Sequence, residues 1–247
     1  MRLFGGFERT HERGMSLVKD EAANGDDRGW NNSRWLVAFE FSIVAGVYVA
    51  RAHHILKFSS VPYLFILAWT SLRVRGVQWR QIGFARYRNW ATTLGLGIAS
   101  GAGLELFDLF GKQRLLTQLL GRPPDLSGLP AVRGNLTLAM VLIVVIWIVA
   151  AFGEELVYRG YMMNRIAGLG RGSQMAWVLS LFLISAVFGV SHYRQGLTGV
   201  IEEGSDGLIL GLMYLACRRN LAVPIVAHGV CDTIDIVLLF LGKYPGL

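Results

Sequence analysis

The sequence predicts an all-α fold: a polytopic membrane helix bundle of about seven transmembrane helices, with six to eight as the range. Hydrophobic residues make up 53% of the 247 residues and charged residues only 17%, whereas a soluble domain usually carries about a quarter charged residues. Several apolar segments also approach the ~20 residues that a helix needs to cross the hydrocarbon core. The segments lie at 35–50, 55–72, 91–110, 136–167, 175–196, 197–217 and 221–241.

Residues 1–34 form a polar arm ahead of the transmembrane domain, which we assign to 35–247. The arm contains six basic and six acidic residues and lacks the apolar stretch of a cleavable signal, so the first span is expected to direct insertion. That span is short and contains Glu40, and the second contains Lys57 and Pro62. These are the two weakest of the seven predictions.

The third and sixth spans contain glycines four residues apart, at Gly97 and Gly101 and at Gly207 and Gly211. Small residues at this spacing let helix backbones approach closely in lipid. We favour packing within one bundle over a dimer interface, but the motif alone does not separate the two, and the oligomeric state stays open.

The arginines indicate an orientation. The connection 73–89 contains five arginines and no acid, which is typical of a cytoplasmic loop. The amino-terminal arm is then cytoplasmic, as are Arg171, Arg218 and Arg219, whereas the segment around Glu202, Glu203 and Asp206 lies on the opposite side. One loop disagrees, because 111–135 is also basic and is expected outside. The net charge of +7 is spread over short loops rather than one soluble face, so we expect no nucleic-acid partner.

Ionisable residues inside membrane spans are the strongest functional signal. Each costs about 2.5–3.5 kcal/mol at a helix centre, so one that is present usually has a partner or a task. Three apolar segments of the carboxyl-terminal half contain them: Glu154, Glu155 and Arg159; then His192; then His228 and Asp232.

Helix geometry allows these three groups to meet. If the fourth helix continues to about Ala167, Glu154 lies about 20 Å from the following turn at 1.5 Å per residue. On the same scale His192 lies about 27 Å along the next helix and His228 about 12 Å into the last. All three are then inside the membrane core, provided that the fourth helix does not end at Phe152.

Local spacing suggests separate roles. Glu155 and Arg159 are four residues apart with the acid first, the favourable order for an ion pair on a helix. Glu154 is left as the unpaired carboxylate, which suits a general base. His228 and Asp232 are again four apart, so the carboxylate can accept a hydrogen bond from the imidazole. A lone buried histidine is usually a packing element, but for the whole set we favour function over packing.

Three motifs carry a resemblance to a known family. EELVYR at 154–159, FGVSH at 188–192 and HGVCD at 228–232 occur in this order on successive apolar segments. They resemble the EExxxR, FxxxH and HxxxN/D motifs of the CAAX protease and bacteriocin-processing (CPBP, or Abi) family, which includes the Ras-converting CAAX endopeptidase. The resemblance covers about 135–240, and RQIGF at 80–84 is similar to a recurrent upstream element.

The resemblance implies an intramembrane glutamate endopeptidase with many helices. In such an enzyme Glu154 and His192 would activate a water molecule, and His228 with Asp232 would stabilise the oxyanion. Asp232 departs from the family, whose best-known members have asparagine there. Either Asp232 is protonated, or it only orients His228, and we favour orientation. Glu155, Arg159 and Phe188 complete the motifs as supporting residues.

Zinc is the mechanistic alternative, because glutamate, histidine and aspartate side chains can bind it. The sequence has no HExxH motif, and the family is better described as metal-independent, so we expect no cofactor.

The substrate is predicted to be a membrane-associated peptide or protein tail, either CAAX-type or a bacterial leader or sorting peptide. A non-catalytic peptide-binding or immunity protein on the same scaffold is the alternative function. A transporter is less favoured, because no inverted repeat is visible. The arginine-rich loops and short arm suggest the bacterial inner (plasma) membrane, with the lipid bilayer as a partner.

Overall fold

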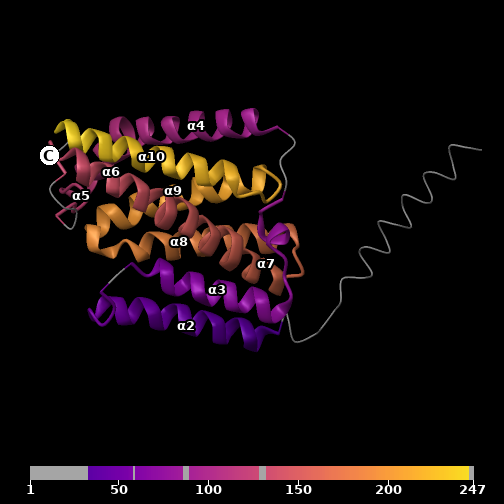
Figure 1. Ribbon diagram of the computed structural model, residues 1–247. Coiled ribbons are helices and arrows are strands. Elements are labelled where there is room, and N and C mark those ends of the chain that lie inside the picture. The colour runs from indigo at the N-terminus through magenta and orange to yellow at the C-terminus, as the bar shows by residue number, and fades with distance from the viewer. Residues whose placement is uncertain (1–32, 58, 86–88, 128–131, 245–247) are drawn as a thin grey trace, which may run out of the picture.

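The computed structural model describes residues 33–57, 59–85, 89–127 and 132–244. Within these residues every regular element is a helix, which confirms the all-α fold class. The predicted polar arm lies outside the described residues except for its last two positions. The described helices form seven units. They run roughly side by side, from α4 at one edge of the bundle to α3 and α2 at the other (Figure 1).

The seven units match the seven predicted spans in order. They comprise α2 (Arg34–Ala52), α3 (Val61–Arg75), α4 (Trp90–Phe107) with η2 (Asp108–Lys112) and α5 (Gln113–Leu120), α6 (Leu136–Val145) with η3 (Ile146–Met163) and α7 (Asn164–Leu169), α8 (Gln174–Ser191), α9 (Gly196–Ala216), and α10 (Ala222–Leu241). Short 3-10 turns, η1 (Trp79–Ile82) and η4 (Tyr193–Gln195), precede α4 and α9.

Five helices in the described part of the chain are long and apolar enough to cross a membrane: Arg34–Ala52, Trp90–Leu120, Leu136–Leu169, Gln174–Ser191 and Ala222–Leu241. The other two units are α3, which has only 15 residues, and α9, which contains Glu202, Glu203 and Asp206. The fourth unit is continuous to Leu169, so the long helix that the depth argument needed is present.

The first span tolerates Glu40 because the bundle pairs it. Glu40 is buried, and one of its oxygens accepts from Arg165 of α7 at 2.5 Å while the other accepts from Ser71 of α3 at 2.5 Å. Pro62 lies at the first turn of α3, where its missing N–H breaks no helical bond. Glu40 and Pro62 therefore fit inside the bundle, whereas Lys57 is exposed in the connection before α3.

Glycines bring helices together within this chain. A Cβ at Gly97 would lie 2.6 Å from Val226, and one at Gly101 would lie 2.9 Å from the Cα of Ala227, so α4 packs directly on α10. On α9, a Cβ at Gly207 would lie 3.1 Å from the ring of Phe188. Both GxxxG motifs thus serve packing within the bundle.

The third unit continues further than predicted. The sequence placed a loop at 111–135, but the helix bends through η2 and continues in α5 to Leu120. Lys112 had been counted as a loop charge, and this was wrong: the lysine is buried and pairs with Asp108 at 2.6 Å and with Asp206 of α9. Its charge is compensated inside the bundle, so the helix does not have to end there.

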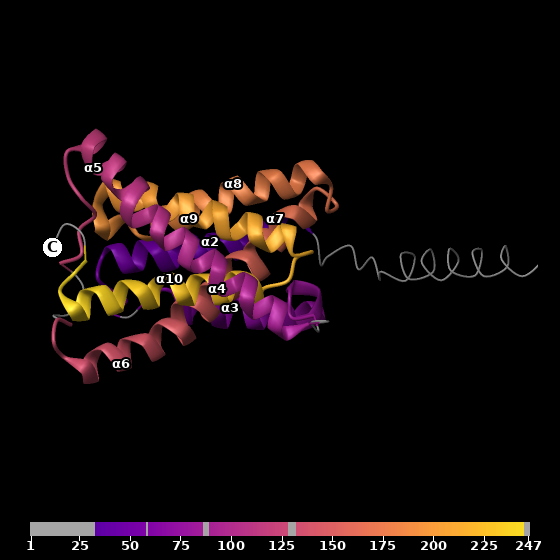
Figure 2. The ribbon, with the colours of Figure 1, turned by 90° about the horizontal axis from the view of Figure 1, so that it is seen from above.

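The connections define two ends of the bundle. The α3–α4, α7–α8 and α9–α10 connections, which contain most of the loop arginines, lie together at one end (Figure 1), where the Leu221 N–H donates to the Gly83 carbonyl at 3.0 Å. We call this the arginine-rich end. The carboxyl-terminal end of α10 lies at the opposite end, where α5 and α6 lie on either side of α10 (Figure 2). The sequence predicted this grouping of the arginines on one side.

Candidate active site

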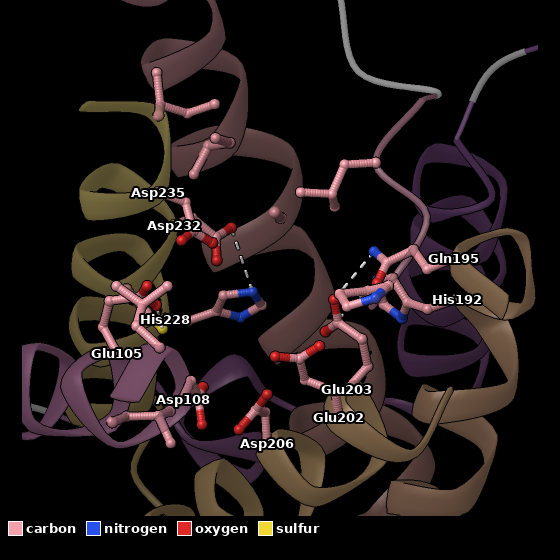
Figure 3. Close-up of a pocket in the computed structure, with 18 of the residues that line it drawn as sticks. Glu105, Asp108, His192, Gln195, Glu202, Glu203, Asp206, His228, Asp232 and Asp235 are labelled. Carbon is pink, nitrogen blue, oxygen red and sulfur yellow. Dashed lines mark hydrogen bonds and ion pairs between the residues drawn. The ribbon is translucent and has the colours of Figure 1, made fainter. Parts of the chain in front are cut away.

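A cavity of about 250 Å³ lies between α4, η3, α9 and α10, in the half of the bundle away from the arginine-rich end. The start of α9 and the connections that contain Pro124, Leu126 and Gln195 close one side of it. Glu154, His192, His228 and Asp232 all lie on its wall, and Figure 3 shows His228 and Asp232 facing His192 across the space. The helix bundle thus brings together the four residues that the sequence singled out as catalytic candidates.

Glu154 and Glu155 point to different surroundings because they are adjacent on one helix. Glu154 is partly buried on the cavity wall and accepts no hydrogen bond from another described side chain. The imidazoles of His192 and His228 line the same cavity. Glu155 faces the interior of the bundle and is completely buried.

Glu155 is held at the centre of a polar cluster. Its Oε1 accepts from Arg159 Nη1 at 2.6 Å and from His228 Nδ1 at 3.0 Å. The guanidinium also donates to the Gly207 carbonyl of α9 at 2.9 Å. The expected ion pair is therefore present, and through His228 it ties η3 to α10.

His228 is oriented chiefly by Glu155. The sequence suggested Asp232 for this task, but the distance from His228 Nε2 to Asp232 Oδ2 is 3.6 Å, which is beyond hydrogen-bond range. Because Nδ1–H donates to Glu155, Nε2 is the nitrogen left for the cavity. At this distance the Asp232 carboxylate can still interact electrostatically with the His228 ring.

Phe188 and His192 form the third part of the site. His192 Nδ1 lies 3.0 Å from the Phe188 carbonyl oxygen, which can only accept, so Nδ1 carries the proton and Nε2 is the free base of the neutral ring. The buried Phe188 ring lies 4.9 Å from the His192 ring and 4.8 Å from the Arg159 guanidinium. The ring also lies 6.3 Å from the His228 ring, so Phe188 packs against both histidines, and its carbonyl holds Nδ1 of His192.

The site contains acids that the sequence analysis did not assign to it. Glu203 of α9 lies 4.0 Å from His192 Nε2 and accepts from the Gln195 amide at 3.2 Å. Glu202 and Asp206, which had been placed at the outer membrane surface, also line the cavity. The sequence did contain a signal for this placement: all three acids lie within the predicted span 197–217, and not in a loop.

The π-helical segment η3 is the second local feature that the sequence did not predict. Such segments are rare and frequently occur at functional sites. At its carboxyl end the Asn164 side chain donates to the carbonyls of Arg159 at 3.1 Å and of Gly160 at 2.9 Å. A side chain thus satisfies backbone acceptors at the transition back to the α-helical α7.

The four candidate residues, Glu154, His192, His228 and Asp232, are not arranged as ligands of a single metal ion. Among the described residues, the group of three donors that lie within 4.8 Å of one another consists of Glu105, Asp108 and Cys231. Glu154, His192 and His228 do not form such a group. A zinc ion bound by the candidate residues would require them to move closer together.

Comparison with known proteins identifies one family. Residues 136–234 match the family model described as Type II CAAX prenyl endopeptidase Rce1-like, and no curated protein and no solved structure matches the chain. The match contains all three motifs and confirms the resemblance over this segment. Together with the five apolar helices, it identifies an integral membrane protein.

Proposed function

We propose that this chain, whose residues 136–234 are Rce1-like, is an intramembrane endopeptidase that hydrolyses a peptide bond with a water molecule activated by Glu154 and His192. One observation carries the proposal: a carboxylate and two imidazoles from three separate helices meet on the wall of one cavity inside an apolar bundle. Peptide hydrolysis needs a base and an electrostatic stabiliser close together, and these three side chains can supply them.

The geometry suggests how the roles divide. Glu154 has no competing hydrogen bond from a described side chain, so it is available to take a proton from water as the oxygen attacks the carbonyl carbon. His192, with Nδ1 held by the Phe188 carbonyl, presents Nε2 to the cavity and helps to orient that water. The proton that Glu154 accepts then passes to the leaving amine as the C–N bond breaks.

His228 is proposed to stabilise the oxyanion. Its Nδ1 is fixed by Glu155 at 3.0 Å, and Nε2–H of the protonated ring is the donor on the cavity side. Asp232 at 3.6 Å favours that protonated state by its charge, whether or not it forms a direct hydrogen bond. In this way Asp232 would support oxyanion stabilisation by His228, at a position where the best-known members of the family have asparagine.

No metal ion enters this scheme. The imidazoles of His228 and His192 are oriented by Glu155 and by the Phe188 carbonyl, and the candidate residues are not among the described donors that lie within 4.8 Å of one another. The proposed location is the bacterial inner membrane, and the proposed substrate is a membrane-associated peptide or protein tail.

The test is cleavage of a panel of prenylated and unprenylated peptides by detergent-purified protein. We expect turnover by the wild type, and its loss in Glu154→Gln and in His192→Ala. His53→Ala, which replaces an exposed histidine outside the cavity, serves as the matched control and should keep full activity. Retained cleavage in Glu154→Gln would exclude the mechanism, and specific peptide binding without any cleavage would favour the non-catalytic alternative.

A further inference from the structure

The charge on the cavity wall is strongly one-sided. Eight carboxylates line the cavity, from α4, η2, η3, α9 and α10, but the described lining residues include no lysine or arginine. The two imidazoles of His192 and His228 are the basic groups among them. The carboxylates belong to Glu105, Asp108, Glu154, Glu202, Glu203, Asp206, Asp232 and Asp235.

Part of this charge is compensated by contacts already formed. Lys112, next to the cavity, pairs with both Asp108 and Asp206. Glu203 has the Gln195 amide at 3.2 Å and His192 at 4.0 Å. Asp206 and Glu203 belong to α9, whereas Asp108 lies beside Glu105, across the cavity from His192 (Figure 3).

Glu105 and Asp235 lie on the same side as Asp108, but neither forms an ion pair with a described lysine, arginine or histidine. Glu105 is 3% exposed, its Oε2 accepts from the Cys231 thiol at 2.9 Å, and its Oε1 is buried without a hydrogen-bond partner. Asp235 Oδ1 is likewise buried without a donor from another residue type. The side chains that act on Asp235 are other acids: Glu105, which is within hydrogen-bonding reach of it, Asp232 and Glu203. A buried acceptor without a donor is destabilising, so this pair is suited to receive a donor that comes from outside the chain.

Resting on the proposed function, we propose that the substrate segment bound in the cavity carries a lysine or arginine side chain whose cation pairs with Glu105 and Asp235. An ammonium or guanidinium group supplies both donors and charge to the two unpartnered oxygens, and a guanidinium can do so in a bidentate manner. The substrate would therefore be cleaved next to a basic residue within an apolar segment.

A divalent metal ion is the competing occupant of this side of the cavity. Glu105 and Asp108 share it with Cys231, and one donor atom of each lies within 4.8 Å of the others. A metal ion there would occupy the Glu105 carboxylate and leave no acceptor pair for a substrate cation. The two possibilities differ in a measurable way, because only one requires a peptide.

The experiment measures peptide binding rather than cleavage. Fluorescently labelled apolar model peptides that differ at one central position, with lysine, neutral norleucine or glutamate, are titrated with full-length Glu154→Gln protein in detergent, and anisotropy is recorded. We expect the lysine peptide to bind about tenfold or more tightly than the norleucine peptide, as for one charge-assisted contact. Adding Glu105→Gln and Asp235→Asn should remove the difference, while adding Asp125→Asn, an exposed acid, should not.

Equal affinity for the three peptides, or no binding of any of them, would overturn the inference. So would a stoichiometric metal ion in the purified protein that is lost on Cys231→Ser. Because the protein used here lacks the proposed general base, the result does not depend on turnover. If the lysine peptide binds preferentially but the wild-type protein cleaves no peptide, the proposed function is wrong and the inference about the bound cation still holds.

Discussion

Glu154 and Glu155 are adjacent and chemically alike, yet the structure predicts opposite consequences when each is replaced by glutamine. Glu155 is completely buried and accepts from both Arg159 and His228. Glu154 lies on the cavity wall without a hydrogen bond from a described side chain. Glutamine keeps the shape of either residue and removes its charge, so Glu155→Gln should lower stability and Glu154→Gln should stop turnover.

The magnitudes follow from what each change leaves behind. Glu155→Gln leaves the Arg159 guanidinium buried with only the Gly207 carbonyl at 2.9 Å as a strong acceptor, and breaking a buried pair in this way costs about 3–5 kcal/mol. Glu154→Gln breaks no such contact, so the free energy of unfolding should change by no more than about 0.5 kcal/mol. Its effect on the rate should be the loss of a general base, about 10²- to 10⁴-fold.

Denaturant titration in detergent gives the free energy of unfolding, and peptide cleavage gives the rate, for both variants and the wild type. A third variant, Glu155→Gln with Arg159→Met, removes both partners of the ion pair. Replacement of both partners of a buried pair by neutral groups is often tolerated, so the double variant should be more stable than Glu155→Gln alone. Equal destabilisation by the two single glutamine variants, or further loss in the double variant, would refute this account of the cluster.

Three further predictions concern packing, orientation and metal. Gly101→Ala should destabilise the protein by about 1–3 kcal/mol because its Cβ would overlap the Ala227 backbone, whereas Gly103→Ala has open space and should be neutral or stabilising in the same unfolding assay. In a variant without native cysteines, Ser127→Cys near the cavity should react with an impermeant maleimide on intact cells, and Gln174→Cys at the arginine-rich end only after permeabilisation; the reverse pattern would place the cavity on the cytoplasmic side. Excess chelator should leave peptide cleavage unchanged, and activity lost to chelator but restored by zinc would make the candidate residues metal ligands.

Hydropathy predicted most of the fold because the bilayer constrains it so strongly. Each of the seven predicted segments corresponds to a helical unit, and the continuous helix to Leu169 gives Glu154 the depth that the prediction required. The errors lie where a charge is compensated by a distant partner. Lys112 was assigned to a loop because its partner Asp206 is 94 residues away, and Glu40 weakened the first span because Arg165 is 125 residues away.

The candidate site divides in the same way. Spacing of four residues within one helix was enough to predict the pairing of Glu155 with Arg159. The same spacing predicted a hydrogen bond between His228 and Asp232. In the structure, Glu155 of another helix, 73 residues away, forms the hydrogen bond to the imidazole instead. No periodicity in a single sequence contains that information, nor does it reveal that Glu105 and Asp235 face the same cavity.

The acids of the cavity are difficult to explain by stability. Each ionisable residue within a membrane helix costs about 2.5–3.5 kcal/mol when it is alone, and an apolar side chain of similar size would pack the same space without that cost. The residues concerned come from separate helices and converge on one volume, while the lipid-facing positions of α4 and α8, such as Leu96 and Phe182, are exposed and apolar. These acids therefore converge on the cavity, where the proposed substrate and water molecule would bind. Under the two proposals, Glu105 and Asp235 would select a positively charged substrate side chain, and the Glu155–Arg159 pair would hold His228 in position.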